Sequence, residues 1–139
     1  MLASMIGVDN TLEIPHEIIR VNTALIYNSL EWIKKFNISN VLFTSTSECY
    51  SGTIDKFGYK IPTPEEIPLC IDPIDHPRFT YAVTKMLGES GFLNYAKIFE
   101  FNCKIIRLLP KTVYEKAIID WLADFKNKSV TQTFELPAL

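Results

Sequence analysis

Three features of the sequence predict an α/β fold with parallel strands. Residues 41–43 and 104–109 are short runs of the residue types that buried strands prefer. Residues 81–99, between them, carry apolar side chains at helical spacing. A strand, a helix and a second strand make a βαβ unit, whose two strands run parallel.

The first 36 residues are expected to form a broken or edge strand, a loop and a long helix. Residues 1–8 are apolar, and the polar pair Asp9-Asn10 follows them. Pro15 suits the first turn of a helix, where its missing N–H is not needed. The helix has one mixed face and one apolar flank, namely Ile18, Asn22, Leu25, Ser29, Trp32 and Phe36 on the face, and Ile19, Ile26, Leu30 and Ile33 on the flank. We therefore expect a sheet and another helix to cover it on two sides.

Polar residues directly follow the strand predicted at 41–43. They are Thr44, Ser45, Thr46, Ser47 and Glu48. Ligands of open α/β sheets bind beyond the carboxyl ends of the strands, so Thr46, Ser47 and Glu48 lie where a site is expected. A solvated loop that caps a helix would account for the same residues.

Residues 50–78 are expected to form a long irregular loop. They contain Gly52, Gly58 and five prolines with no regular period. Pro77 ends the loop just before the helix predicted at 81–99. Loops of this length inside a compact domain usually serve a site or cover one.

Tyr81 and Lys85 are four residues apart and therefore share one face of the predicted helix. A phenol has a pKa near ~10 in water, and a lysine ammonium one turn away lowers that value by favouring the phenolate. The pair could supply a base near neutral pH. The spacing alone also fits an ordinary half-exposed pair, because Y-x-x-x-K arises often by chance.

The composition excludes several classes of partner. The 139 residues are 47% hydrophobic and 22% charged, which suits one soluble domain. The formal net charge is −2 and Lys and Arg form no run, so neither nucleic acid nor an anionic membrane is an expected partner. Cys49, Cys70 and Cys103 are odd in number and widely spaced, which predicts free thiols without a metal site. No stretch resembles a membrane span or a signal peptide, so we expect a cytoplasmic protein.

Taken in order, the motifs resemble those of the extended short-chain dehydrogenase/reductase family, the NAD-dependent nucleotide-sugar epimerases and dehydratases. The matching segments are Leu2-Ala3-Ser4, Asn22, Ser45-Thr46-Ser47-Glu48-Cys49-Tyr50, Pro64-Glu65-Glu66, Tyr81 with Lys85, and Arg107. The resemblance covers about residues 1–109 and implies a partial Rossmann-like, doubly wound parallel sheet. Residues 110–139 are interpreted as a divergent tail, with a helix expected over 113–125 and no pattern in 129–139.

The resemblance implies a role for each candidate site residue. Tyr81 would take a proton from a sugar hydroxyl while NAD takes a hydride from the same carbon, C4. Lys85 would lower the pKa of Tyr81, and both residues would contact the cofactor together with Ala3. Thr46 would hydrogen-bond the reacting oxygen. Glu48 would act as an acid or a base, which favours 4,6-dehydratase or decarboxylase chemistry over 4-epimerisation.

The resemblance also implies two structural contacts. Asn22 would fix the helix or a water behind Lys85, although a buried amide satisfied by the backbone explains it as well. A homodimer would form through the helices at 15–36 and 81–99, because an apolar flank suits packing into a four-helix bundle.

Two features depart from the family pattern. The G-x-x-G-x-x-G turn that seats the cofactor pyrophosphate at a helix N-terminus has no counterpart in the 139 residues. Residues 109–115 only loosely resemble the segment that leads to the family's substrate domain. We therefore expect a central fragment that binds NAD weakly or not at all, lacking the Gly-rich βαβ and the substrate domain. A non-catalytic chain, inactive or in need of a partner chain, is the alternative.

Overall fold

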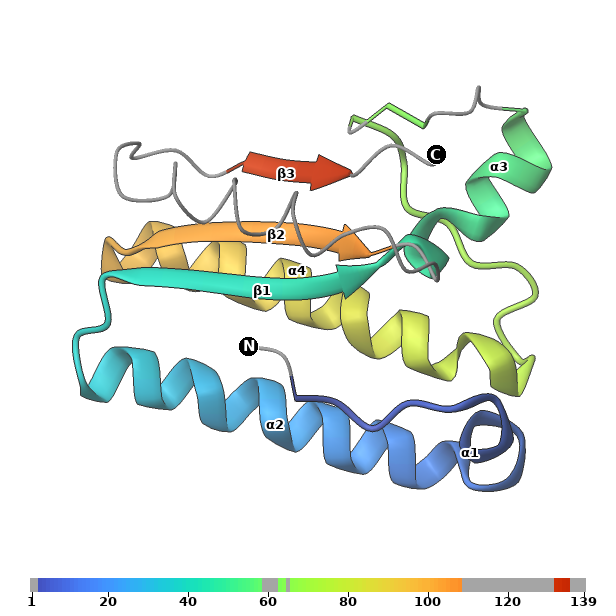
Figure 1. The fold of residues 1–139 in the computed structure, drawn as a ribbon, viewed down its shortest axis with the longest axis horizontal. Helices are drawn as coiled ribbons and strands as arrows, with labels where there is room; N and C mark the ends of the chain where they lie inside the picture. The colour runs from blue at the N-terminus through green and yellow to red at the C-terminus, as the bar shows by residue number, and fades with distance from the viewer. Residues whose placement is uncertain (1–2, 59–62, 65, 109–131, 136–139) are drawn as a thin grey trace.

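The computed structural model describes residues 3–58, 63–64, 66–108 and 132–135, which form an α/β arrangement (Figure 1). In chain order the elements are α1 Val8–Glu13, α2 Pro15–Lys35, β1 Asn40–Thr46, the 3-10 helix η1 Ser47–Tyr50, α3 Ser51–Phe57, the 3-10 helix η2 Pro77–Phe79, α4 Thr80–Phe99, β2 Asn102–Leu108 and β3 Gln132–Glu135. No described helix has both the length and the hydropathy needed to cross a bilayer.

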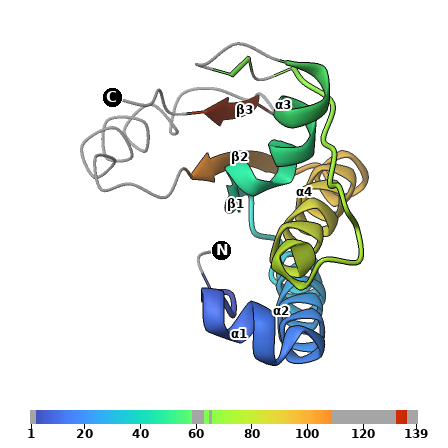
Figure 2. The same cartoon turned by 90° about the vertical axis from the view of Figure 1, so that its right-hand side faces the viewer.

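The described strands form one parallel sheet in the order β1-β2-β3. β1 and β2 pair in register from Asn40 opposite Asn102 to Thr46 opposite Leu108. Between these strands the chain forms α4, which packs along both of them (Figures 1 and 2). The predicted βαβ unit is confirmed, and the carboxyl ends of β1 and β2 lie side by side.

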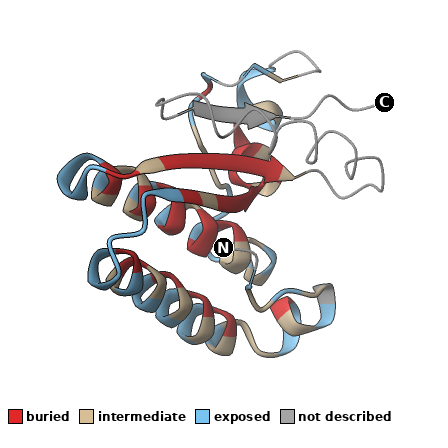
Figure 3. Ribbon diagram, turned by 60° about the vertical axis from the view of Figure 1, so that its left-hand side comes forward, coloured by how far each residue is buried: buried red, intermediate tan, exposed pale blue. Residues whose placement is uncertain are grey.

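The hydrophobic core lies between the sheet and α4 and continues to α2. Phe43 of β1 stacks on Phe92 of α4 with the ring centroids 4.8 Å apart, and neither ring is exposed. Figure 3 shows the buried residues gathered on β1, on β2 and on the sides of α2 and α4 that face them. The other members of the core are Ile26, Leu30, Ile33, Val41, Ala96, Phe101, Cys103 and Ile105. Burial of their apolar surface, at ~25 cal/mol per Å², holds both helices in place.

Helix α2 begins at Pro15, as predicted, but its buried stripe differs from the prediction. The buried residues are Ile18, Asn22, Ile26, Leu30 and Ile33. Trp32 and Phe36, expected on a covered face, are 66% and 60% exposed, and Ile19 on the expected flank is 53% exposed. The stripe takes residues from both predicted faces because α2 packs mainly along one neighbour, α4. The prediction of cover on two sides was wrong for the described residues.

Two short helices lie where loops were predicted. α1 replaces the loop expected at Asp9-Asn10, and the amide of Asn10 supports it by donating to the carbonyl oxygen of Ile6 at 3.0 Å. Residues 3–7, expected to be a strand, have no regular structure. α3 takes up the first part of the expected irregular loop and ends at Gly58, whose φ of 66° is the left-handed conformation that closes many helices.

The C-terminal part differs from the prediction at one described element. β3 lies within residues 129–139, where the sequence shows no pattern, and it pairs with β2 from Lys104 opposite Gln132 to Arg107 opposite Glu135. The position of β3 depends on pairing with β2, which is distant along the chain, and local periodicity carries no information on such pairing. The helix expected over 113–125 lies outside the described residues.

Replacing Gly88 with alanine should destabilise the fold. A Cβ at Gly88 would overlap the ring of Phe43, with Cε1 and Cε2 at 3.0 and 3.1 Å. Phe92 stacks on that ring and limits its movement, so overpacking of ~1–3 kcal/mol should exceed the ~1 kcal/mol by which alanine favours a helix over glycine. Urea denaturation measures the difference. Gly91→Ala is the matched control, because its Cβ would meet methyl groups of Leu30 and Ile26, at 3.3 and 4.0 Å, and no aromatic ring; equal stability of the two variants would contradict the prediction.

Candidate functional site

A cavity of about 900 Å³ lies at the carboxyl end of β1. The residues that line it include Ser4, Ile6, Leu12, Thr44, Thr46, Glu48, His76, Arg78, Tyr81 and Lys85. They come from the segment before α1, from α1, from β1 with η1, and from η2 with the first turns of α4. The cavity therefore lies at the strand end where the sequence predicted a site.

Four residues predicted for catalysis meet in this cavity. Tyr81 and Lys85 line it from α4, and Thr46 and Glu48 line it from the end of β1 and from η1. The ammonium of Lys85 donates a hydrogen bond to the carbonyl oxygen of Thr44 over 2.7 Å. This bond ties the first turns of α4 to β1 and keeps the predicted pair facing the strand end.

Ala3, predicted to contact the cofactor, and Ser47, predicted beside Thr46 at the strand end, do not line the cavity. Ala3 is exposed, whereas its neighbour Ser4 is partly buried and lines the cavity. This segment therefore contributes the side chains of Ser4 and Ile6 to the cavity.

Burial controls the protonation of Tyr81 and Lys85. Loss of solvent raises the pKa of the Tyr81 phenol, and a hydrogen bond with the side chain of Ser4 opposes that shift. Loss of solvent also lowers the pKa of Lys85. Nζ of Lys85 lies 5.0 Å from the ring centroid of Phe43 and 5.5 Å from that of Tyr81. The pKa of Tyr81 is therefore shifted in the direction opposite to the one expected from the sequence.

Asn22 of α2 holds three segments together. Its side-chain oxygen accepts from the backbone N–H of Met5 at 2.7 Å, and its amide nitrogen donates to the Met5 carbonyl at 3.1 Å. The same nitrogen donates to Oγ1 of Thr84 at 3.2 Å, and Thr84 donates to the carbonyl of Tyr81 at 2.8 Å. The buried amide is satisfied largely by backbone, and by fixing Met5 it also fixes Ser4 beside Tyr81.

A buried network joins β1, α4 and β2 near the cavity. Arg107 donates from Nε to Oε1 of Glu89 at 3.0 Å and from Nη2 to Oε2 at 2.7 Å. Ser45 donates to the same Oε1 at 2.5 Å. The resemblance had pointed to Ser45 and Arg107 but not to Glu89, although Glu89 lies one helical turn after Lys85 and so on the same side of α4.

Arg78 was also missed by the sequence reasoning. Its Nη2 lies 3.2 Å from Oε1 of Glu48, and both side chains line the cavity. The sequence signal that could have indicated Arg78 was its position, directly after Pro77 and three residues before Tyr81. Thr46 accepts the N–H of Glu48 at 3.3 Å and so caps η1, as the alternative interpretation of these residues predicted, while still lining the cavity.

The described residues offer no metal site and no disulfide. They contain no group of three His, Cys, Asp or Glu side chains that could hold a metal ion. The three cysteines are free, with Cys49 and Cys103 buried and Cys70 partly buried.

Comparison with known proteins gives a family match over most of the chain. Residues 1–114 match the NAD dependent epimerase/dehydratase family. The chain is similar to Protein CapI of Staphylococcus aureus, with 31% identity over 114 residues. This match covers 81% of the chain but 30% of CapI, so the chain spans under a third of the length of that relative.

Solved structures share the fold. The UDP-N-acetylglucosamine 4-epimerase of Bacillus cereus matches with a TM-score of 0.71 and 21% identity, over 99% of this chain and 56% of that one. The UDP-glucuronic acid 4-epimerase of Bacillus cereus, in complex with NAD, matches with a TM-score of 0.55 and 24% identity, over 88% of this chain and 38% of that one. At these identities the likeness supports the Rossmann-like fold class alone.

Replacing Glu89 with glutamine should destabilise the chain by about 3 kcal/mol. The change removes the carboxylate that Arg107, 6% exposed, contacts at two points, and breaking a buried ion pair in this way is costly. Urea denaturation measures the loss. Glu17→Gln is the control, because it breaks the exposed pair with Arg20 on α2 and should leave stability unchanged within error. Equal effects of the two changes would contradict the prediction.

The free energy of unfolding should fall at alkaline pH because of Cys49. Burial raises the pKa of this thiol from 9.0 to about 12. As pH rises, the thiol ionises in the unfolded chain at lower pH than in the folded chain. The preference of the fold for the protonated thiol therefore stabilises the protein fully below about pH 9, and this stabilisation is lost as pH rises toward 12. The loss should be about 1 kcal/mol near pH ~10. Urea denaturation at several pH values checks it. Cys49→Ala should remove this part of the dependence, and an unchanged profile would contradict the assignment.

Proposed function

Because the chain belongs to the NAD dependent epimerase/dehydratase family, we propose that it oxidises a nucleotide sugar at C4 with NAD as cofactor. The observation that carries the proposal is the single cavity in which Tyr81, Lys85 and Thr46 meet. Tyrosine and lysine on one helix face, opposite a hydroxyl at a strand end, suit removal of a proton from an alcohol. A cytoplasmic location stays a prediction from the sequence.

The residues of the cavity fit a nicotinamide nucleotide. Its volume of about 900 Å³ is in the range of small-molecule sites. Ile6 and Leu12 line the cavity and are 59% and 53% exposed. Their side chains are therefore accessible, and they offer an apolar wall to the flat nicotinamide ring. Lys85 would hold the ribose hydroxyls, with Tyr81 and the backbone near Ala3 as further contacts. When bound, NAD supplies a hydride acceptor for the sugar carbon.

In the proposed reaction Tyr81 takes the proton of the sugar hydroxyl. The raised pKa of its buried phenol means that the phenolate must gain support when substrate binds. Lys85 can give that support, because its Nζ already lies 5.5 Å from the Tyr81 ring centroid. Thr46 would donate its hydroxyl proton to the reacting oxygen and so orient the sugar.

Glu48 favours 4,6-dehydratase or decarboxylase chemistry within this reaction class. Its carboxylate lines the same cavity as Thr46 and Tyr81. A keto group at C4 acidifies the neighbouring C–H bond, and a carboxylate nearby can move that proton. The similar solved structures named above are 4-epimerases, but at identities of 21% and 24% their likeness supports the fold alone. 4-Epimerisation is therefore the competing outcome within the same class.

A non-catalytic chain, inactive or in need of a partner chain, is the second candidate function. The observation that favours it is the missing G-x-x-G-x-x-G turn in these 139 residues, since that turn supplies the pyrophosphate site in the family. The flanking DNA separates the candidates. An upstream reading frame that encodes a Gly-rich βαβ unit would support the enzyme, and its absence would support the non-catalytic chain.

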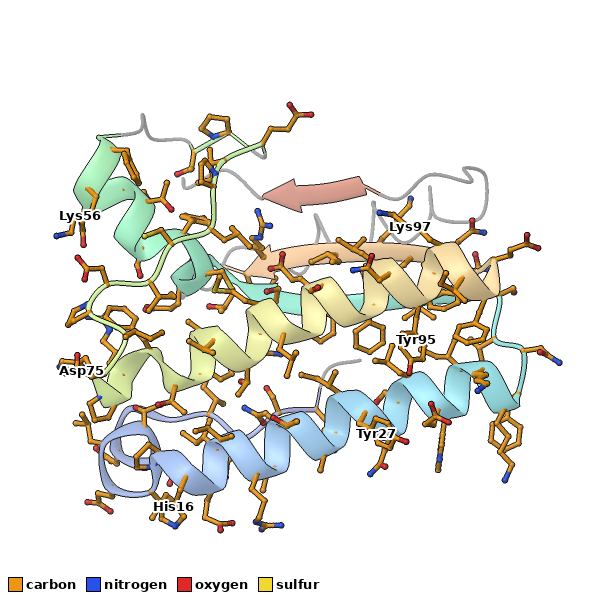
Figure 4. All side chains as sticks on the ribbon, turned by 180° about the vertical axis from the view of Figure 1, so that it is seen from behind. His16, Tyr27, Lys56, Asp75, Tyr95 and Lys97 are labelled. Carbon is orange, nitrogen blue, oxygen red and sulfur yellow. The ribbon has the colours of Figure 1, made fainter. Side chains whose placement is uncertain are left out.

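We also propose that the chain forms a homodimer through α2 and α4. Large apolar residues are exposed on both helices, namely Ile19 and Tyr27 on α2, and Leu87 and Ile98 on α4. Figure 4 shows Tyr27 and Tyr95 on the face that these two helices share. Two neighbouring helices with exposed apolar residues can pair with a second copy into a four-helix bundle.

Replacing Tyr81 with phenylalanine should abolish most of the proposed oxidation. Loss of a general acid–base group typically costs ~100-fold or more in rate. Consumption of a UDP-sugar in the presence of NAD, followed by chromatography of the sugar products, measures the rate. Tyr27→Phe, on an exposed tyrosine, is the matched control. An unchanged rate in Tyr81→Phe would rule out the proposed base, and no rate in the unmodified chain would favour the non-catalytic candidate.

Replacing Leu87 with glutamate should convert the dimer to a folded monomer. Leu87 is 49% exposed, so the change places a charge on the proposed interface without touching the core. Sedimentation at roughly tens of micromolar, where exposed apolar surface associates, measures the oligomer. Ile26→Asp is not an interface test, because Ile26 is 4% exposed in the core and the change should unfold the chain. A monomeric unmodified chain would contradict the dimer.

A further inference from the structure

An ion pair links the two ends of the segment that connects β1 to α4, the elements that carry Thr46 and Tyr81. Nη2 of Arg78 lies 3.2 Å from Oε1 and 3.5 Å from Oε2 of Glu48. Glu48 belongs to η1, directly after β1, and Arg78 belongs to η2, directly before α4. The pair therefore joins the turn directly after Thr46 to the turn directly before the helix that carries Tyr81.

The backbone that presents Arg78 is fixed by its neighbours. Nδ1 of His76 accepts the backbone N–H of Arg78 at 3.1 Å and so caps η2. Pro77 at the first position restricts the backbone φ angle of this turn. Cζ of Arg78 lies 5.8 Å from the ring centroid of Phe79, close enough for the guanidinium to rest against the ring. These contacts set the direction from which the guanidinium reaches Glu48.

The ion pair is too exposed to be needed for the fold. The side chains of Arg78 and Glu48 are 63% and 31% exposed, and pairs with such exposure contribute little to stability. The buried pair of Glu89 and Arg107 performs the structural role instead. What the exposed pair can do is restrict the rotamers of a glutamate that would otherwise sample several positions.

We propose that Arg78 is a positioning residue that holds the Glu48 carboxylate against the cavity. This inference rests on the proposed function in one respect, because it assumes that Glu48 acts on the ligand. In this proposal Arg78 acts through Glu48, to which its Nη2 donates. His76 takes part indirectly, by capping the turn that aims Arg78.

The first test measures the rotamer of Glu48 without any turnover. Three-bond couplings across χ1 of Glu48 in the isotope-labelled chain should report one dominant rotamer. Arg78→Gln should average the couplings, and Arg78→Lys, which keeps the charge, should restore part of the preference. Arg20→Gln, which breaks the exposed pair on α2, is the matched control and should change nothing at Glu48. Identical couplings in the unmodified chain and in Arg78→Gln would overturn the proposal.

The reciprocal variant gives a second measurement on the same pair. In Glu48→Gln the guanidinium loses its carboxylate, so rotation of the Nη groups of Arg78 should speed up in nitrogen-15 spectra. No change in that rotation would show that the two side chains do not restrain each other, and would overturn the proposal.

Ligand binding separates positioning from direct recognition. Titration with UDP-glucose should give an affinity within about threefold for the unmodified chain and Arg78→Gln, while turnover falls by ~10-fold or more. A tenfold loss of affinity with unchanged Glu48 couplings would overturn the proposal and make Arg78 a ligand contact. If no nucleotide sugar binds or reacts, the proposed function fails, and the Glu48 couplings still decide whether Arg78 positions that carboxylate.

Discussion

The buried ion pair between Glu89 and Arg107 is the interaction on which the arrangement of β1, α4 and β2 depends. The residues are 4% and 6% exposed, and two charges so deeply buried are tolerable only when they face each other with good geometry. Arg107 makes a two-point contact with the carboxylate, and Ser45 donates to it from β1. A slip of α4 along the sheet would separate these groups, so the pair helps to select one position for the helix.

The candidate site follows from that position. Once Glu89 is fixed, the preceding turn of α4 brings Lys85 to the carbonyl of Thr44, and the turn before that brings Tyr81 to the cavity. Gly88 lets this part of α4 approach Phe43 closely enough for both contacts to form. The chemistry proposed for Tyr81 thus relies on packing that lies one and two turns further along the same helix.

Burial gives this site its chemical character. The same loss of solvent raises the pKa of Tyr81 and lowers that of Lys85, so both groups are biased toward their neutral forms. A substrate hydroxyl that hydrogen-bonds the phenolate would reverse part of that bias. Asn22 adds to the site from a third element, because its bonds to Met5 keep the side chain of Ser4 beside Tyr81.

The sequence by itself determined the βαβ unit, the parallel pair and the shared face of Tyr81 and Lys85, because periodicity and i, i+4 spacing are local properties of the chain. The tertiary structure decided which stripe of α2 is buried, the direction of the Tyr81 pKa and the partners of Glu48 and Glu89. Each of these depends on side chains that are 18 or more residues away along the chain, such as Arg107 for Glu89 and Arg78 for Glu48. Solvent exclusion and charge pairing arise only when those distant segments pack together, so no local pattern in the sequence records them.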